Sequence, residues 1–305
     1  MITRAQKLRQ ILGRDELVIA PGVYDGYSAR LVEAAGFETA ATSGAAVSNS
    51  VLGIDDIGVM GLNENVLHCQ RIAAAINIPL TADADTGYGN PVNVHYTVQQ
   101  FEQAGLAGVN IEDQVHPKRC GHMPGKEVVP IVEMVKKIEA ACLARWDDAF
   151  MIIARTDALA IEGIEGAVER VRAYVQAGAD MIFPDGARSE DDIKRIVDAA
   201  GIPVTINMGF GIRSRPTTPL IPLPALAQMG VRRVSLPRML PAAAIMGMSR
   251  ALDCMKDVIR TGVPTDRPDL AVGIEEIMQL MGYDEMRALE RKLLTTESLE
   301  VKYGN

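Results

Sequence analysis

Eight short apolar runs alternate along the chain with longer amphipathic stretches, and this alternation restricts the possible folds more than any other feature. Runs that are apolar almost throughout are typical of strands buried on both faces, as in a parallel sheet. Strands that alternate with helices in this way favour an α/β fold of the (β/α)8 TIM-barrel type, with a doubly wound open sheet as the alternative. The expected strands are Leu17–Ala20, Glu38–Thr42, Pro79–Asp83, Ala107–Glu112, Phe150–Ala154, Asp180–Pro184, Pro203–Ile206 and Val231–Ser235.

The amphipathic stretches between these runs predict the outer helices, and several of them end at a glycine. Glycine takes the left-handed conformation at a helix C-terminus without steric cost, so it marks these boundaries. The helices are expected over Tyr27–Ala35, Asn63–Ala75, Pro91–Ala104, Ile131–Arg145, Ile164–Ala177, Ser189–Ala199 and Leu223–Met229.

The chain is longer than eight strand–helix pairs require. Pro241–Ile259 predicts one further helix, and Ile274–Tyr303 predicts several more. We therefore expect a single barrel domain over residues 1–305, with 241–305 as a C-terminal helical extension. These extra helices would pack outside the barrel or on a neighbouring subunit.

Composition limits the class of protein. Hydrophobic residues make up 48% of the chain and charged residues 23%, which is usual for a globular enzyme. The net charge of −8 disfavours nucleic acid as a partner, because its phosphates require a basic surface. The start of the chain lacks an apolar signal core, and no run of about 18 apolar residues is present to span a membrane. The four cysteines are far apart and form no C-x-x-C pair, so we expect a cytoplasmic protein without a disulfide framework.

Polar residues follow most of the expected strands at their carboxyl ends, where barrels of this type have their active sites. Asp83 and Asp85 end the third strand and Glu112 ends the fourth. Side chains two apart on a strand point to the same side, so the two aspartates would repel unless a cation or proton lies between them. Oxygen ligands suit Mg²⁺ or Mn²⁺. The alternative is that such residues are helix N-caps or turn residues.

Residues 118–122 read K-R-C-G-H and place one cysteine among basic side chains. Positive charges around a cysteine favour its thiolate, so Cys120 is expected to handle protons. Gly121 beside it allows the backbone to approach a ligand closely. Cys120 and His122 could instead bind a soft metal, but no second Cys/His pair has the spacing of a zinc site.

Further motifs occur in order along the chain: A-P-G-V-Y-D-G (20–26), T-S-G-A-A (42–46), L-G-I-D-D-I-G (52–58), D-A-D-T-G-Y-G-N (83–90), I-E-D-Q-V (111–115), G-K (125–126), I-A-R-T-D-A (153–158) and F-P-D-G (183–186). Together with K-R-C-G-H, they resemble the isocitrate lyase/phosphoenolpyruvate mutase superfamily over about the first 240 residues. K-R-C-G-H narrows the resemblance to the carbon–carbon lyase branch, which includes 2-methylisocitrate lyase, 2,3-dimethylmalate lyase and the related oxaloacetate hydrolase.

The resemblance implies a role for each matching residue. Asp83 and Asp85 would hold Mg²⁺, with Asp56 and Glu112 supporting it through water. Cys120 would be the general acid on a mobile loop. The other implied catalytic residues are Tyr24, Arg155, Lys118 and His122. The implied substrate-binding residues are Ser43, Gly44, Ala45, Gly121, Arg155, Asp185 and Asn207. The resemblance also implies a homo-oligomer, commonly a tetramer that exchanges C-terminal helices.

The chain departs from the family pattern between residues 207 and 242. It reads N-M-G-F-G-I-R-S-R-P-T-T-P over 207–219, with extra residues and without an expected glutamate. Arg213 and Arg215 there could contact a carboxylate or could be solvated loop charges. Ala242 stands where a substrate-binding arginine would align, although Arg238 is near.

The function expected from this resemblance is Mg²⁺-dependent cleavage of the C2–C3 bond of a 2-hydroxy di- or tricarboxylate. The products would be a 2-oxo acid and a second carboxylate, and the substrate would be similar to 2-methylisocitrate or 2,3-dimethylmalate. Hydrolysis or decarboxylation of oxaloacetate is the second enzymatic possibility. A barrel that binds a carboxylate without catalysis is the third.

Overall fold

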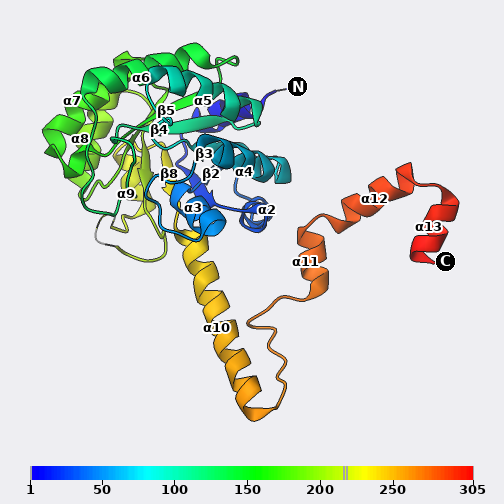
Figure 1. Ribbon diagram of the computed structural model, residues 1–305. Helices are drawn as coiled ribbons and strands as arrows, with labels where there is room; N and C mark the ends of the chain where they lie inside the picture. The colour runs from blue at the N-terminus through cyan, green and yellow to red at the C-terminus, as the bar shows by residue number, and fades with distance from the viewer. Residues whose placement is uncertain (1, 216, 218, 305) are drawn as a thin grey trace. The chain divides into compact units, whose positions relative to one another are not determined.

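A parallel eight-stranded sheet forms the centre of the protein in the computed structural model, which describes residues 2–215, 217 and 219–304 (Figure 1). Neighbouring strands follow the order β6-β5-β4-β3-β2-β1-β8-β7. The two outer strands of this order also meet, because the Ile182 N–H donates to the Pro203 carbonyl at 3.0 Å beside an isolated parallel bridge to Val204. The sheet therefore closes into a barrel, which confirms the (β/α)8 prediction over the open sheet. The strands are β1 (Val18–Val23), β2 (Ala40–Thr42), β3 (Leu80–Asp83), β4 (Gly108–Glu112), β5 (Met151–Thr156), β6 (Met181–Pro184), β7 (Thr205–Asn207) and β8 (Arg233–Leu236).

Helices that alternate with the strands cover the outside of the barrel (Figure 1). The first turns of some of these helices are stabilised by side chains that accept from backbone N–H groups, as Asn90 does at the start of α5 and Ser189 at the start of α8. Each expected helix is present with its ends shifted by no more than a residue or two. They are α2 (Gly26–Ala34), α4 (Leu62–Ala75), α5 (Pro91–Gln103), α6 (Ile131–Ala144), α7 (Gly163–Gln176), α8 (Glu190–Ala200) and α9 (Leu223–Gln228).

Two helices near the N-terminus were not expected from the sequence. Helix α1 (Arg4–Leu12) has buried apolar residues at helical spacing, and α3 (Gly44–Leu52) follows β2 directly. A single 3₁₀ turn, η1 (Ala158–Ala160), follows β5. Helix α3 consists largely of small residues, which give little amphipathic pattern, so the T-S-G-A-A segment did not predict it.

Helix α1 closes the amino-terminal end of the barrel. Its residues Leu8, Ile11 and Leu12 form one buried apolar cluster with inward-facing residues of three strands. Those residues include Val18, Met151 and Met181, each the first residue of its strand. The amino-terminal end of the barrel is therefore an apolar floor. A polar binding site is expected at the opposite end, where the strands finish.

The chain divides into two compact units, Met1–Ala242 and Ala243–Asn305. The division lies close to the expected start of the extension at residue 241. The extension is helical as predicted, and its helices contain no buried residue. They are α10 (Met239–Thr261), α11 (Ile274–Leu280), α12 (Tyr283–Leu293) and α13 (Thr296–Tyr303). Within the described part of the chain, no helix has both the length and the apolar character needed to cross a membrane.

Candidate active site

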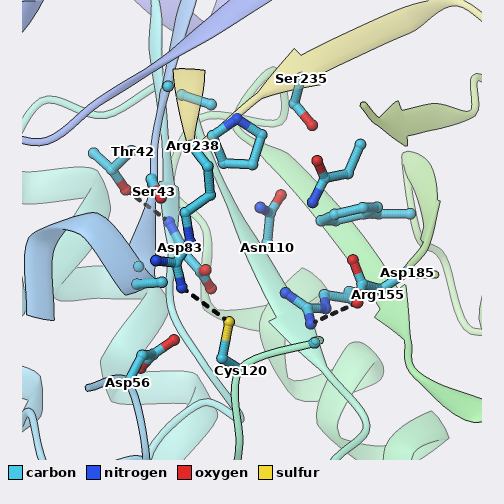
Figure 2. Close-up of a pocket in the computed structure, with 18 of the residues that line it drawn as sticks. Thr42, Ser43, Asp56, Asp83, Asn110, Cys120, Arg155, Asp185, Ser235 and Arg238 are labelled. Atoms are coloured by element: carbon cyan, nitrogen blue, oxygen red, sulfur yellow. Dashed lines mark hydrogen bonds and ion pairs between the residues drawn. The ribbon is translucent and has the colours of Figure 1, made fainter. Parts of the chain in front are cut away.

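A cavity of about 50 Å³ lies at the carboxyl ends of the strands (Figure 2). Residues from all eight strands or from the segments that follow them line it, as expected for a barrel of this type. Most of the predicted site residues are among them: Ser43, Gly44, Ala45, Asp56, Asp83, Lys118, Cys120, Gly121, His122, Arg155, Asp185 and Asn207. Three others, Tyr24, Asp85 and Glu112, do not line it.

The predicted aspartate pair is formed by a turn rather than by strand alternation. Strand β3 ends at Asp83, and Asp85 lies beyond it with a positive φ of 48°. The Asp85 N–H donates to Asp83 Oδ1 at 3.2 Å. The two residues are therefore close, but the argument from the period of two was wrong, because Asp85 is not part of the strand.

Lys118 binds two of the predicted metal-site acids. Its buried ammonium lies 2.7 Å from Asp56 Oδ2 and 2.8 Å from Asp85 Oδ1. Burial lowers the pKa of Lys118, but the charges of Asp85 and Glu112 outweigh it and raise that pKa well above the ordinary value. Burial, only partly opposed by Lys118, raises the pKa of Asp85 to about 6. The single positive charge of Lys118 therefore does not neutralise the negative charges of the carboxylates around it.

Glu112 provides the best test of whether this group of acids suits a cation. Its carboxylate is 1% exposed, and in the described part of the chain neither oxygen has a hydrogen-bond partner. Arg155 Nε lies 3.2 Å from Oε2, at ion-pair distance only. Burial raises the pKa of Glu112 well above the ordinary value. In the described residues no three ligand side chains converge as a complete metal cage. Such an oxygen-rich but incomplete set fits Mg²⁺, which keeps several waters and uses one or two carboxylates.

Arg155 enters the cavity from the end of β5 and is held by acids. Its Nε and Nη2 donate to Asp157 at 2.8 and 3.1 Å, and Nη2 lies 3.4 Å from Asp185 Oδ2 (Figure 2). Lys126 Nζ also contacts Asp157, at 2.8 Å. These charges lower the pKa of Asp157, although burial alone would raise it. The arginine is therefore fixed in place before any substrate arrives.

A second, fully buried network lies behind Arg155. Asp113 accepts hydrogen bonds from the Thr156 hydroxyl at 2.7 Å and from the Asp157 N–H at 2.9 Å. It also accepts from the Tyr174 hydroxyl at 2.7 Å and pairs with Arg170 at 3.3 Å. The network connects helix α7 to the loop after β5, so it positions Asp157 and, through it, Arg155.

The K-R-C-G-H segment forms a loop over the cavity, with Cys120 8% exposed. The cation beside the thiol is not one of its neighbours in sequence. Lys118 points to the acids, whereas Arg238, which follows β8, donates to Cys120 Sγ at 3.2 Å (Figure 2). A Cβ on Gly121 would lie 1.9 Å from Asp185 Oδ2, so only glycine permits this loop position.

The first turn of α3 supplies the cavity with backbone donors. Ser43 caps the helix by accepting from the Ala46 N–H at 3.3 Å, while Gly44 and Ala45 line the cavity. The N–H groups and dipole of a helix N-terminus favour a carboxylate. Ser43 is thus an N-cap, in agreement with the alternative interpretation for such residues, and Asp25 caps α2 in the same way.

His122 connects the K-R-C-G-H loop to the atypical 207–219 segment. Its Nε2 accepts from Arg215 and its Nδ1 lies 2.7 Å from Thr217 Oγ1. Because an arginine N–H can only donate, Nε2 carries no proton and Nδ1–H donates to the threonine. Burial and the Arg215 charge lower the pKa of His122 from 6.5 to about 4.

This lowered pKa predicts a pH dependence. The folded state disfavours the charged imidazole, so the stabilisation associated with neutral His122 is lost as pH falls from about 6.5 towards 4. We expect the His122 ring to remain neutral at pH 5.5 in an NMR titration, while surface-exposed imidazoles are largely protonated there. A titration midpoint near pH 6.5 for the His122 ring would contradict its burial beside Arg215.

Several cavity residues were not predicted from the sequence. Arg233 is 1% exposed and donates to the hydroxyls of Thr205 at 3.1 Å and Thr81 at 3.2 Å, and burial lowers its pKa to about 10. Asn110 lines the cavity with its Oδ1 unpaired within the described residues. Arg233 and Asn110 are polar residues within strands that are otherwise largely apolar. This is the sequence pattern that could have identified them as residues of the site. Tyr24 instead lies outside the cavity lining, where its carbonyl accepts from His68 Nε2 at 2.6 Å.

Comparison with known proteins identifies the family to which this fold belongs. The family model for phosphoenolpyruvate phosphomutase matches residues 8–256. A probable 2-methylisocitrate lyase of Corynebacterium glutamicum is 39% identical over 293 residues, which are 96% of this chain and 92% of that protein. The 2,3-dimethylmalate lyase of Eubacterium barkeri is 38% identical, over 95% of this chain and 98% of its own. The chain therefore belongs to the phosphoenolpyruvate mutase/isocitrate lyase superfamily, as the sequence motifs predicted.

Solved structures of the superfamily share this architecture. Oxaloacetate acetylhydrolase in complex with the inhibitor 3,3-difluorooxalacetate gives a TM-score of 0.87 at 34% identity, over 95% of this chain and 97% of that one. The 2,3-dimethylmalate lyase structure gives the same TM-score at 36% identity, over 96% of both chains.

Proposed function

We propose that this protein is a carbon–carbon lyase that cleaves the C2–C3 bond of a 2-hydroxy di- or tricarboxylate similar to 2-methylisocitrate or 2,3-dimethylmalate. One observation above all supports this proposal: a buried thiol, Cys120, lies in the wall of a cavity whose other lining residues include Asp83 (Figure 2). Relatives that are similar over almost the whole chain are named as lyases of these two substrates.

The residues divide the chemistry between them. Backbone donors of Gly44 and Ala45 hold a carboxylate, and the fixed Arg155 guanidinium adds positive charge. The 2-hydroxyl gives its proton to a carboxylate of the cavity lining, and its oxygen becomes the carbonyl of the 2-oxo acid as the C2–C3 bond breaks. The electron pair of that bond remains on the α-carbon of the departing carboxylate. The Cys120 S–H then protonates that carbon. The closed loop excludes water, which would otherwise quench the carbanion.

A divalent cation completes the proposed site. Asp83 and Asp85 would hold Mg²⁺ or Mn²⁺, with Asp56 and Glu112 supporting it through water, and the cation would stabilise negative charge developing on a bound substrate. We expect treatment with EDTA to abolish cleavage, and Mg²⁺ or Mn²⁺ to restore it. Cleavage at an undiminished rate in excess chelator would contradict the proposal.

A product screen tests the function itself. The purified protein with Mg²⁺ is incubated with 2-methylisocitrate, isocitrate, 2,3-dimethylmalate and oxaloacetate, and the products are identified by NMR. Pyruvate, propionate and succinate are the expected kinds of product from the branched substrates. Acetate plus oxalate would favour the second candidate, oxaloacetate hydrolysis, which the similarity to oxaloacetate acetylhydrolase supports. Pyruvate plus CO₂ from oxaloacetate would indicate decarboxylation, and no product from any compound would favour a non-catalytic carboxylate-binding barrel.

We also propose that the protein acts in the cytoplasm as a homo-oligomer, in the form of a tetramer. Helix α10 exposes a series of large apolar side chains, which a second copy could cover. They include Ile245, Met248, Leu252, Met255 and Ile259, each more than half exposed. A monomer in multi-angle light scattering would contradict this proposal.

A further inference from the structure

The segment that carries the two predicted metal-binding aspartates has an unusual backbone. We call residues 83–88, which read D-A-D-T-G-Y, the acidic turn. Among the described residues, Asp85 and Tyr88 are the only non-glycine residues with positive φ, at 48° and 58°. Residues other than glycine seldom adopt this left-handed conformation, and it persists where surrounding contacts fix it. Contacts that hold this conformation are therefore expected around the turn.

The backbone carbonyls of the acidic turn receive these contacts. The carbonyls at positions 84 and 85 accept from backbone N–H groups at 2.9 and 2.8 Å. Those of Asp83, Thr86 and Gly87 accept from side chains instead. Each carbonyl from position 83 to position 87 thus has a hydrogen-bond partner, as buried backbone groups require.

The three side-chain donors lie on three consecutive helices around the barrel, α4, α5 and α6 (Figure 1). All three are buried, with no more than 3% of the residue exposed. The hydrogen bonds run from Asn65 to the Asp83 carbonyl at 2.8 Å, from Thr97 to the Gly87 carbonyl at 3.1 Å, and from Lys137 to the Thr86 carbonyl at 3.1 Å. The acidic turn is therefore anchored to three separate elements.

Two of these donors are polar groups that a merely space-filling role would not require. Within the described part of the chain, the Thr86 carbonyl is the one hydrogen-bond partner of the buried Lys137 ammonium. Burial of an ammonium group is costly, and an apolar side chain would fill the same space at lower cost. The Asn65 amide also donates to the Tyr88 hydroxyl at 2.7 Å, so it contacts both ends of the turn.

We propose that Asn65, Thr97 and Lys137 are positioning residues of the divalent-cation site, which hold the acidic turn so that Asp83 and Asp85 can bind one cation. This inference rests on the proposed cation site and deepens it. While the helices hold the carbonyls of the turn, Asp83 lines the cavity and the Asp85 N–H donates to Asp83 Oδ1 at 3.2 Å. Loss of an anchor would let the turn relax and the two carboxylates move apart, which weakens a cation bound to both.

Binding of Mn²⁺ to the full chain without substrate tests this inference independently of turnover. The protein is titrated with MnCl₂, and free Mn²⁺ is measured by electron paramagnetic resonance. Thr97→Val removes one hydroxyl donor at nearly constant volume, and Lys137→Met removes the ammonium. Each should raise the Kd for Mn²⁺ by about 10- to 100-fold, the range for lost partners around a metal ligand. Thr97→Ser keeps the hydroxyl and should bind Mn²⁺ as the unmodified protein does.

A matched control separates positioning from general stability. Thr39 is also fully buried, and its hydroxyl donates to the Pro79 carbonyl at 3.0 Å, outside the acidic turn. Thr39→Val should lower the urea unfolding midpoint about as much as Thr97→Val, yet leave the affinity for Mn²⁺ unchanged. The inference is overturned if Thr97→Val and Lys137→Met bind Mn²⁺ as tightly as the unmodified protein, or if Thr39→Val weakens binding equally.

Failure of the proposed function gives different results. An unmodified protein that binds no Mn²⁺ would refute the cation site and the positioning role together. Binding of Mn²⁺ with no cleavage product in the substrate screen would refute the lyase proposal alone. Far-UV circular dichroism verifies that each variant is folded. Because Thr97→Val and Lys137→Met alter different helices, either one is sufficient for the test.

Discussion

Replacement of Cys120 by serine is expected to lower the turnover number of the cleavage reaction by about 100- to 10,000-fold, the range typical of a lost general acid. Serine is nearly isosteric, so the loop and the Arg238 contact at this position can remain. Its hydroxyl is a much weaker acid than a thiol and donates a proton to a carbanion less readily. Turnover is measured by release of the 2-oxo acid, and binding of product analogues by calorimetry.

The matched control is Cys254→Ser, because Cys254 lies in α10 and does not line the cavity. It should retain full turnover. Product binding should survive in Cys120→Ser, which separates loss of proton transfer from loss of the site. Near-normal turnover in Cys120→Ser would remove Cys120 from the mechanism.

Replacement of Asp113 by alanine is expected to destabilise the protein by about 3–5 kcal/mol, because a buried acceptor of three hydrogen bonds is lost. Asp113 is 0% exposed and accepts from Thr156, Asp157 and Tyr174 while pairing with Arg170. Alanine would leave the donors of Thr156, Asp157 and Tyr174 without their acceptor, whereas Arg170 would keep its ion pair with Glu162 at 2.7 Å. Asp113→Asn keeps one acceptor oxygen and should cost less. The measurement is urea unfolding of each variant at neutral pH.

An exposed ion pair provides the comparison. Asp198 pairs with Lys194 on the surface of α8, and Asp198→Ala should change the unfolding free energy by less than about 1 kcal/mol. If Asp113→Ala costs no more than Asp198→Ala, the network behind Arg155 has no structural importance.

The barrel could be predicted because its signal is local and repeated. Strands buried on both faces appear as apolar runs, and a glycine follows several helices, so all eight strands and seven outer helices were located. Helix α3 was missed because its first turn, built from Gly44, Ala45 and Ala46, offers no apolar face to detect. Closure of the barrel depends on the pairing of Ile182 with Val204, which no local pattern encodes.

Most residues of the site could be predicted from the sequence. The contacts between these residues could be predicted much less well. The sequence places Lys118 beside Cys120, yet the lysine binds Asp56 and Asp85, residues distant in sequence. The cation on the thiol, Arg238, comes from beyond β8. Such pairings depend on which loops the barrel brings together, so neighbours in sequence are a poor guide to them.

The apolar floor formed by α1 has a kinetic consequence. Since the amino-terminal end of the barrel is sealed by Leu8, Ile11 and Leu12, ligands exchange through the loop-covered carboxyl end. In the proposed reaction, both products must therefore leave past the K-R-C-G-H loop beside the cavity. Movement of this loop, rather than bond cleavage, should then limit the rate at which products are released.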